Sequence, residues 1–432
     1  MLKRLVYQYP VATAMVVSFF LLLIRGRDRF QHAHLWAEDG TIYLQQAYSL
    51  GEKSLTNLMD GYYQVVPRVI AFLGSVFIPI EFIPRFIFLM SLVAHSVMIS
   101  LFASHSYRWI ISSTPLRIII VLALCLAPGL HEILGNLANI ATTTMLILGI
   151  ISLKSLRAKF KLAELIICLL AIFTQGACIL LLPVFALRLY LKIRDKYSQG
   201  DWWPEALILL AIILATYVNV HFGGSGHVPN SHQIGSYVAT EIRLILSLFF
   251  MYPWAGDFTK EFMAIVLLPF FFPFVLRRIR EIPNREKLVL VFAYAGLIGY
   301  PMLTFFVRNG AAAHYSSQLG VFTFSMHRYS FLLPAAGYIF WMFILFRTKG
   351  FFPDRRVLPL ILTAVFSLLS LHRFFVDAYG TKLSWESSLP LLKKSEATGC
   401  PATVDLPIYP EGWGFKYTSP LSGVQCDPRK RK

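Results

Sequence analysis

Long apolar runs separated by short polar segments recur along the whole chain. A helix needs about 20 apolar residues to cross the hydrocarbon core, and fewer where it packs within protein. Runs of this kind predict an all-α polytopic membrane protein with about 11 transmembrane helices. The predicted spans are Leu5–Ile24, Pro84–Ser104, Arg117–Leu130, Ile140–Leu153, Leu162–Thr174, Gly176–Tyr190, Glu205–His221, Glu261–Leu276, Leu288–Phe306, Tyr329–Phe346 and Val357–His372.

The stretch Leu162–Tyr190 is short for two spans, but Gln175-Gly176 interrupts its middle and basic residues flank both ends. A helical hairpin with its tip at Thr174-Gln175-Gly176 fits this pattern best. The N-terminal run resembles a signal peptide in layout but ends at Arg25-Gly26-Arg27 without a small-residue cleavage site. We interpret it as an uncleaved first span.

Short basic loops set the predicted orientation. With these crossings, all the basic clusters fall on one side together with Lys3 and Arg4, and by the positive-inside rule that side is cytoplasmic. We interpret the clusters as anchors that face anionic lipid. They are Arg108 with Arg117; Lys154, Arg157, Lys159 and Lys161; Arg188, Lys192, Arg194 and Lys196; Arg277, Arg278, Arg280, Arg285 and Lys287; and Arg347, Lys349, Arg355 and Arg356.

Counting Tyr63–Ile80 as a further span would move every later basic loop to the side opposite Lys3 and Arg4, and Pro67-Arg68 within it is unfavourable at mid-bilayer. We therefore predict an interfacial or re-entrant helix there. The first outer loop then covers residues 25–83, and residues 374–432 form a small extracytoplasmic C-terminal tail. The expected location is a bacterial inner membrane, with the N-terminus cytoplasmic and the C-terminus periplasmic.

Composition agrees with a membrane protein, because 56% of the 432 residues are hydrophobic, 15% are charged and the mean hydropathy is +0.60. The net charge of +17 belongs mainly to the loop clusters, which argues against a nucleic-acid partner. In the tail, Cys400 and Cys426 are a candidate disulfide if the tail lies outside the cytoplasm, with two unpaired thiols as the alternative. Alternation in Trp413–Tyr417 predicts a strand.

The first outer loop contains the main candidate for chemistry, the acidic pair Glu38-Asp39 beside Trp36. Two carboxylates just outside the bilayer are a candidate general base. The alternative is that Asp39 caps the short helix expected at Thr41–Leu50, which carries Tyr43. Taken alone, the sequence favours neither interpretation.

The second outer turn, with Glu132, Asn136 and Asn139, is predicted to meet the first loop and to supply a second carboxylate or a polar clamp. The alternative is a capped beginning of the next helix, in which the side-chain amides of Asn136 and Asn139 form hydrogen bonds with neighbouring residues. The arginines at 68, 308 and 328 lie near the outer ends of spans and could bind a phosphate or diphosphate, whereas a single arginine at such a position is more often an interfacial anchor. The loop histidines fit no metal-binding spacing, so no cofactor is expected. The sequence does not decide whether the protein requires a divalent metal.

This arrangement is similar to the GT-C superfamily, whose members are membrane glycosyltransferases that use lipid-phosphate-linked sugars. The resemblance rests on the first span, the Trp36–Gly40 stretch with its acidic pair, Tyr43, Gly61-Tyr62 and Pro67-Arg68. Protein O-mannosyltransferases and aminoarabinose transferases have an Asp-Glu order that is reversed here, and O-antigen glucosyltransferases are a further similar family. The resemblance implies that residues 1–373 are a GT-C-like transmembrane domain and that Glu132 is the second acidic position.

The function implied is inverting transfer of a sugar from a polyprenyl-phosphate donor to a cell-surface glycan or lipid acceptor. A phosphate leaves without protonation, so such an enzyme needs one carboxylate base and cations for the phosphate. Asp39 is preferred narrowly over Glu38 as the base. Trp36, Tyr43, Arg68, Glu132, Arg308 and Arg328 are the candidate substrate-binding residues. The main alternative is a transporter or flippase of lipid-linked sugars, favoured by the helix break at Gln175.

Overall fold

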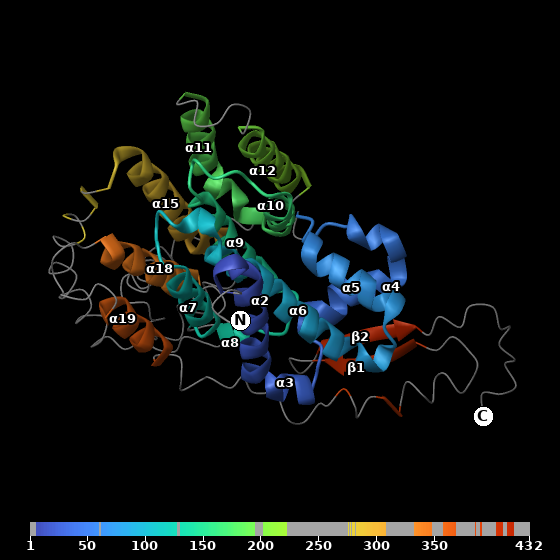
Figure 1. Ribbon diagram of the computed structural model, residues 1–432. Helices are drawn as coiled ribbons and strands as arrows, with labels where there is room; N and C mark the ends of the chain where they lie inside the picture. The colour runs from blue at the N-terminus through green and yellow to red at the C-terminus, as the bar shows by residue number, and fades with distance from the viewer. Residues whose placement is uncertain are drawn as a thin grey trace, which may run out of the picture.

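The computed structural model of the chain consists mostly of helices, with one small β-hairpin near the C-terminus (Figure 1). It describes residues 6–59, 62–127, 130–194, 202–222, 282–307, 332–347, 357–368, 403–408 and 413–418, together with positions 275, 277, 279, 280, 385, 389 and 390. All structural statements below concern these residues.

Every predicted span except Glu261–Leu276 coincides with a helix, and that one falls almost entirely outside the described residues. The matching helices are α2 (Pro10–Arg25), α6 (Ile83–Ser100), α7 (Thr114–Cys125), α9 (Ile140–Ser152), α10 (Leu162–Thr174), α11 (Leu182–Arg194), α12 (Trp203–Phe222), α15 (Asn284–Val307), α18 (Leu332–Arg347) and α19 (Val357–Leu368). The break predicted at Gln175 is confirmed, since α10 ends there and the 3₁₀ turn η6 (Gly176–Leu181) leads into α11.

Three helical stretches are long and apolar enough to cross a membrane: Ile80–Ala103, Gly176–Arg194 and Trp203–Phe222. They support a membrane protein, while the number of about 11 crossings stays a prediction. Short helices make the connections: α3 (Arg27–Gln31), η1 (Asp39–Leu44), α4 (Gln45–Leu50), η2 (Gly51–Leu55), η3 (Ile80–Phe82), η4 (Leu101–Ala103), η5 (His105–Tyr107) and α8 (Leu130–Ile133).

Helix α9 lies at the centre of the bundle, packed against α6, α10, α15 and α18 (Figure 1). It buries all of its residues except Ala141, which is only partly exposed, as expected for a helix that is apolar on all sides. Helix α12 lies at the edge and exposes large apolar side chains, including Leu210, Ile213 and Val220. In a bilayer such a face contacts lipid.

Helix α5 (Val65–Phe77) is the segment that was predicted to be interfacial. It buries Arg68 and Ile70 while exposing Val76 and Phe77, so it is amphipathic. Its 13 residues rise about 20 Å, which is short of the roughly 30 Å hydrocarbon core. Helices α9 and α10 have the same length, so length does not separate α5 from the predicted spans, and its interfacial position stays a prediction.

The loops gather in two groups at opposite ends of the helices. The first loop meets the tip of the α10–α11 hairpin, where Val66 N–H donates to Thr174 Oγ1 at 3.1 Å and the Tyr63 and Phe173 rings pack at 6.3 Å. We call this end the loop face. At the other end, the backbone N–H of Ser155 donates to the Ser106 carbonyl at 3.1 Å. The sequence predicts this separation, because basic loops alternate along the chain with loops that lack basic clusters.

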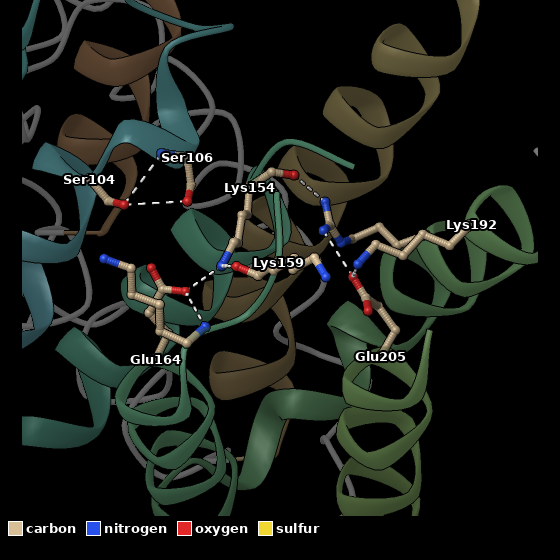
Figure 2. Close-up of polar contacts among 9 residues, drawn as sticks. Ser104, Ser106, Lys154, Lys159, Glu164, Lys192 and Glu205 are labelled. Atoms are coloured by element: carbon tan, nitrogen blue, oxygen red, sulfur yellow. Dashed lines mark hydrogen bonds and ion pairs between the residues drawn. The ribbon is translucent and has the colours of Figure 1, made fainter. Parts of the chain in front are cut away.

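At that second end, here called the ionic face, buried charges join α10, α11 and α12 (Figure 2). Lys154 Nζ binds Glu164 Oε2 and donates to the Lys159 carbonyl at 2.7 Å. Glu205 Oε1 lies 3.1 Å from Arg188 Nη2 and 2.8 Å from Lys192 Nζ.

The prediction that these basic clusters face lipid is wrong for four residues. Lys154, Arg188, Lys192 and Arg117 are at most 4% exposed. Their cations are stabilised by ion pairs with buried carboxylates or by hydrogen bonds to backbone carbonyls, because a charge whose surroundings exclude water needs such partners. The ionic face therefore connects neighbouring helices through buried ion pairs, in addition to carrying basic surface residues.

The strand predicted in the tail is confirmed as part of an antiparallel hairpin of β1 (Thr403–Ile408) and β2 (Trp413–Thr418), in which Ile408 pairs with Trp413. Alternate residues of the hairpin are buried against the first loop. The Tyr48 ring of α4 packs on Phe415 and Tyr417, with centroids 6.0 and 5.3 Å away. The tail thus returns to the loop face, in agreement with the prediction that it shares a side with the first loop.

Candidate functional site

The first loop places its acidic pair at the beginning of a π-helix, η1 (Asp39–Leu44), which continues into α4. A π-helix is rare and is found mostly as a single wide turn at functional sites. Gly40 lets the hairpin approach closely, since a Cβ there would lie 2.7 Å from Ile408 Cδ1. The acidic pair is therefore held between the bundle and the C-terminal hairpin.

Asp39 is 1% exposed and joins the first loop to the second outer turn. Its Oδ1 accepts hydrogen bonds from the backbone N–H groups of Leu137 (3.1 Å) and Ala138 (2.9 Å), and its Oδ2 accepts from Leu137 at 3.0 Å. No side chain caps η1 or α4, so the interpretation of Asp39 as a cap is wrong. The predicted meeting of the two loops is confirmed.

Burial raises the pKa of Asp39 to about 8, and the neighbouring Glu38 adds to the shift, while the hydrogen bonds from Leu137 and Ala138 oppose it. The carboxyl is therefore mostly protonated at pH 7. A pKa close to working pH is typical of groups in active sites, although buried structural carboxyls share it.

The side chain of Glu38 is partly buried, and its Oε2 is enclosed without a hydrogen-bond partner. A buried carboxylate oxygen normally has a partner, so an oxygen without one indicates a group that awaits a donor. The two carboxylates of the pair thus differ. Asp39 is fully engaged by the protein, whereas Glu38 retains capacity to accept a hydrogen bond or a proton.

Tyr43 lies one turn after the pair and is 1% exposed. Its hydroxyl donates to Oε1 of Gln64, the residue that precedes α5. Gln64 has a φ of 51°, a left-handed conformation that non-glycine residues seldom adopt and that surrounding contacts must hold in place. The Tyr43 hydroxyl is therefore used to fix the entrance to α5.

Arg68 ties three stretches of the first loop together. Its Nε donates to the Tyr63 carbonyl at 2.9 Å, and its Nη1 donates to Gln46 Oε1 at 2.8 Å and to the Ser54 carbonyl at 2.9 Å. Its guanidinium also lies 5.8 Å from the centre of the Tyr43 ring. Its Nη2 is buried without a partner.

The groups of the first loop lie near the Tyr43 hydroxyl. The pKa of Tyr43 is raised by burial above all, then by Tyr62, Asp39 and Glu38, and is lowered by Arg68. Such electrostatic effects require that the groups lie near one another. The structure thus brings together four of the predicted site residues, Glu38, Asp39, Tyr43 and Arg68.

The remaining predicted residues are less informative. Trp36 is partly buried, two residues before Glu38. Glu132 lies in α8, but its side chain falls outside the described part of the structure, as do Arg308, Arg328, Cys400 and Cys426. Asn136 Oδ1 accepts from the backbone N–H of Asn139 at 3.0 Å, so the side-chain amide of Asn136 bonds locally, as the alternative interpretation predicted.

Sequence reasoning missed Gln46, Gln64 and the two backbone donors that hold Asp39. The left-handed conformation of Gln64 has no signature in its residue type. Leu137 donates to the Asp39 carboxylate through its backbone N–H, so the residue type at position 137 could not have indicated this bond. Among the described residues no group of three or more His, Cys, Asp or Glu side chains could hold a metal ion.

No protein-family model, curated protein or solved structure matches the chain. The arrangement of the side chains is therefore the basis for assigning a function.

Proposed function

We propose that the chain is an inverting membrane glycosyltransferase of the GT-C type, acting on the periplasmic face of a bacterial inner membrane. It moves a sugar from a polyprenyl-phosphate donor to a glycan or lipid acceptor. The observation that carries this proposal is the enclosed, unpartnered Oε2 of Glu38, next to an Asp39 that the second loop immobilises. Burial in a low-dielectric site strengthens the electrostatic effects of such groups.

Glu38 is the proposed base, although the sequence narrowly favoured Asp39. Both oxygens of Asp39 already accept backbone hydrogen bonds, and at neutral pH its carboxyl is mostly protonated, so it is a poor acceptor for another proton. In the reaction, Glu38 Oε2 takes the acceptor hydroxyl proton as the acceptor oxygen bonds to the anomeric carbon. The bond from that carbon to the phosphate oxygen breaks, and its electron pair leaves with the phosphate. Attack opposite the leaving group inverts the anomeric centre.

Arg68 is the proposed donor to the phosphate through Nη2, because its other nitrogens hold the loop. A guanidinium is suited to this role, since it stays charged and presents donors in a fixed plane. Arg308 and Arg328 are proposed as further cations for the phosphate, Trp36 as a surface against the sugar, and Glu132 as the second carboxylate.

The test is sugar transfer by the purified protein in nanodiscs with a panel of polyprenyl-phosphate sugars. We expect Glu38→Gln to lower kcat by about 10²–10⁴-fold. Glu52→Gln is the matched control, because Glu52 is an exposed carboxylate in the same loop, and it should retain wild-type activity. Full activity of Glu38→Gln would overturn the assignment of the base. Movement of the lipid-linked sugar across proteoliposomes without any transfer would instead indicate a flippase.

A further inference from the structure

A cavity of about 160 Å³ lies between the beginning of the first loop, the beginning of α6 and the tail. Its lining includes His32, Glu81, Phe82, Arg85, Trp385 and Leu389. None of these residues takes part in the site described above. The cavity brings together a carboxylate, a guanidinium, an imidazole and an indole from segments that are far apart in the sequence.

Trp385 gives the first indication that the cavity receives a ligand. Its side chain is 4% exposed, and its indole Nε1–H is buried without an acceptor in the structure described. A buried donor without a partner is costly, and tryptophan is normally buried only where this group finds one. An acceptor supplied by a ligand would satisfy it.

The charges of the lining indicate what kind of ligand fits. The carboxylate of Glu81 accepts hydrogen bonds, whereas Arg85 and Trp385 donate them. A phosphate or another anion would be repelled by Glu81, and a metal ion would be repelled by Arg85. Hydroxyl groups both donate and accept, so a neutral polyol matches this mixed lining.

The size and the apolar part of the lining narrow the ligand further. A volume of about 160 Å³ is smaller than the roughly 300–1,000 Å³ of pockets for drug-sized molecules. The rings of Trp385 and Phe82 and the side chain of Leu389 supply apolar surface for the C–H face of a ring. We propose that this cavity binds a single pyranose unit through the indole N–H of Trp385 and the carboxylate of Glu81.

The cavity adjoins the elements that carry the acidic pair. Glu81 contributes to raising the pKa of Tyr48, after burial and Tyr417, so it lies near α4 and the hairpin. Because α4 continues η1, the sugar would be held by the same unit that holds Glu38. That this sugar belongs to the acceptor or the donor of a transfer reaction rests on the proposed function; binding of a pyranose does not.

The experiment is saturation-transfer NMR on the full-length protein in nanodiscs, with a panel of free methyl pyranosides and no lipid-linked donor. We expect saturation of the ring protons of at least one pyranoside. Trp385→Phe, which retains the ring but removes the N–H, should raise the Kd about tenfold, and Glu81→Gln should act in the same direction. Trp203→Phe is the control, since Trp203 is exposed at the beginning of α12, and it should bind like wild type.

The absence of saturation for every pyranoside, or equal binding by wild type and a folded Trp385→Ala variant, would overturn the proposal. Glu38→Gln separates the two proposals, because it should bind the pyranoside normally even when transfer is abolished. Retained binding without transfer from any donor would overturn the proposed function alone. Competition identifies the source of the sugar: a polyprenyl-phosphate sugar displaces the pyranoside if the cavity holds the donor, and leaves it bound if the cavity holds the acceptor.

Discussion

The carboxylate of Asp39 accepts hydrogen bonds from the backbone N–H of Leu137 through both of its oxygens, at 3.1 and 3.0 Å, across 98 residues of sequence. The first loop and the turn that follows α8 are therefore held together by a side chain on one and the main chain of the other. This contact separates the roles of two adjacent carboxylates, because it engages Asp39 and leaves Oε2 of Glu38 without a partner.

We expect Asp39→Asn to destabilise the protein by about 1–3 kcal/mol, because the amide NH₂ would face the buried N–H groups of Leu137 and Ala138. The measurement is the melting temperature of the purified protein. Glu38→Gln should leave the melting temperature within a degree or two of wild type while lowering transfer. Equal destabilisation by both substitutions would show that the carboxylates share one structural role.

The stability that Asp39 contributes should depend on pH. The pKa of about 8 in the folded protein lies above the roughly 3.9 of an aspartate in an unfolded chain. Between these values the folded state binds the extra proton, so the unfolding free energy falls as pH rises. The difference in melting temperature between wild type and Asp39→Asn should therefore narrow from pH 5 to pH 8. A difference that widens with pH contradicts a raised pKa.

Tyr43→Phe should weaken the first loop without changing the KM for the donor, although the sequence suggested that Tyr43 binds substrate. The Tyr43 hydroxyl donates to Gln64 Oε1, and its loss would leave a buried acceptor unsatisfied at a cost of about 1–3 kcal/mol. Hydrogen exchange of the α5 amides would detect the loosened entrance to that helix. A raised KM for the donor with unchanged hydrogen exchange of α5 would instead show that Tyr43 binds substrate.

The close approach of Gly40 to the hairpin can be tested with a matched pair of substitutions. Gly40→Ala would place a Cβ 2.7 Å from Ile408 Cδ1, which we expect to cost about 1–3 kcal/mol and to displace the hairpin. Ile408→Val removes that same methyl group. Limited proteolysis within residues 403–418 should be faster in Gly40→Ala and slower again in the double variant. Additive effects of the two substitutions would contradict direct contact.

The ionic face should be sensitive to the loss of a single carboxylate. Glu205→Ala would leave Arg188 and Lys192 buried without their shared partner, and breaking a buried pair in this way costs about 3–5 kcal/mol. Melting temperature and yield of folded protein would report the loss. Glu52→Ala, at an exposed position, is the control and should have an effect below about 0.5 kcal/mol. A loss of less than about 1 kcal/mol in Glu205→Ala would mean that water reaches the buried Arg188 and Lys192 side chains.

Sidedness can be measured by labelling single cysteines in a variant whose five native cysteines are replaced by serine. Glu52→Cys and Lys416→Cys are exposed positions of the first loop and of the hairpin, which contact each other through α4 and β2. A membrane-impermeant reagent added outside should modify both. Arg194→Cys, at the exposed end of α11, should react only after the membrane is opened. The opposite pattern would invert the predicted orientation.

The sequence by itself determined the helices of the bundle. Runs such as Ile140–Leu153 and Leu162–Thr174 reappear as α9 and α10 nearly residue for residue, because an apolar run in a membrane protein must satisfy its backbone groups within one helix. The alternation in Trp413–Tyr417 likewise appeared as a strand, since a half-buried strand repeats every two residues.

Only the tertiary structure decided which side chains are already engaged. Asp39 and Glu38 are adjacent carboxylates in the sequence, yet the fold brings the backbone N–H of Leu137 to Asp39 and no hydrogen-bond donor to Oε2 of Glu38. The burial of Arg188 and Lys192, predicted to face lipid, depends on Glu205 from a different helix. Such partners are set by packing between segments distant in sequence, and hydrogen bonds to main chain leave no trace in residue type. The pattern located the acidic pair, and the packing distinguished its two members.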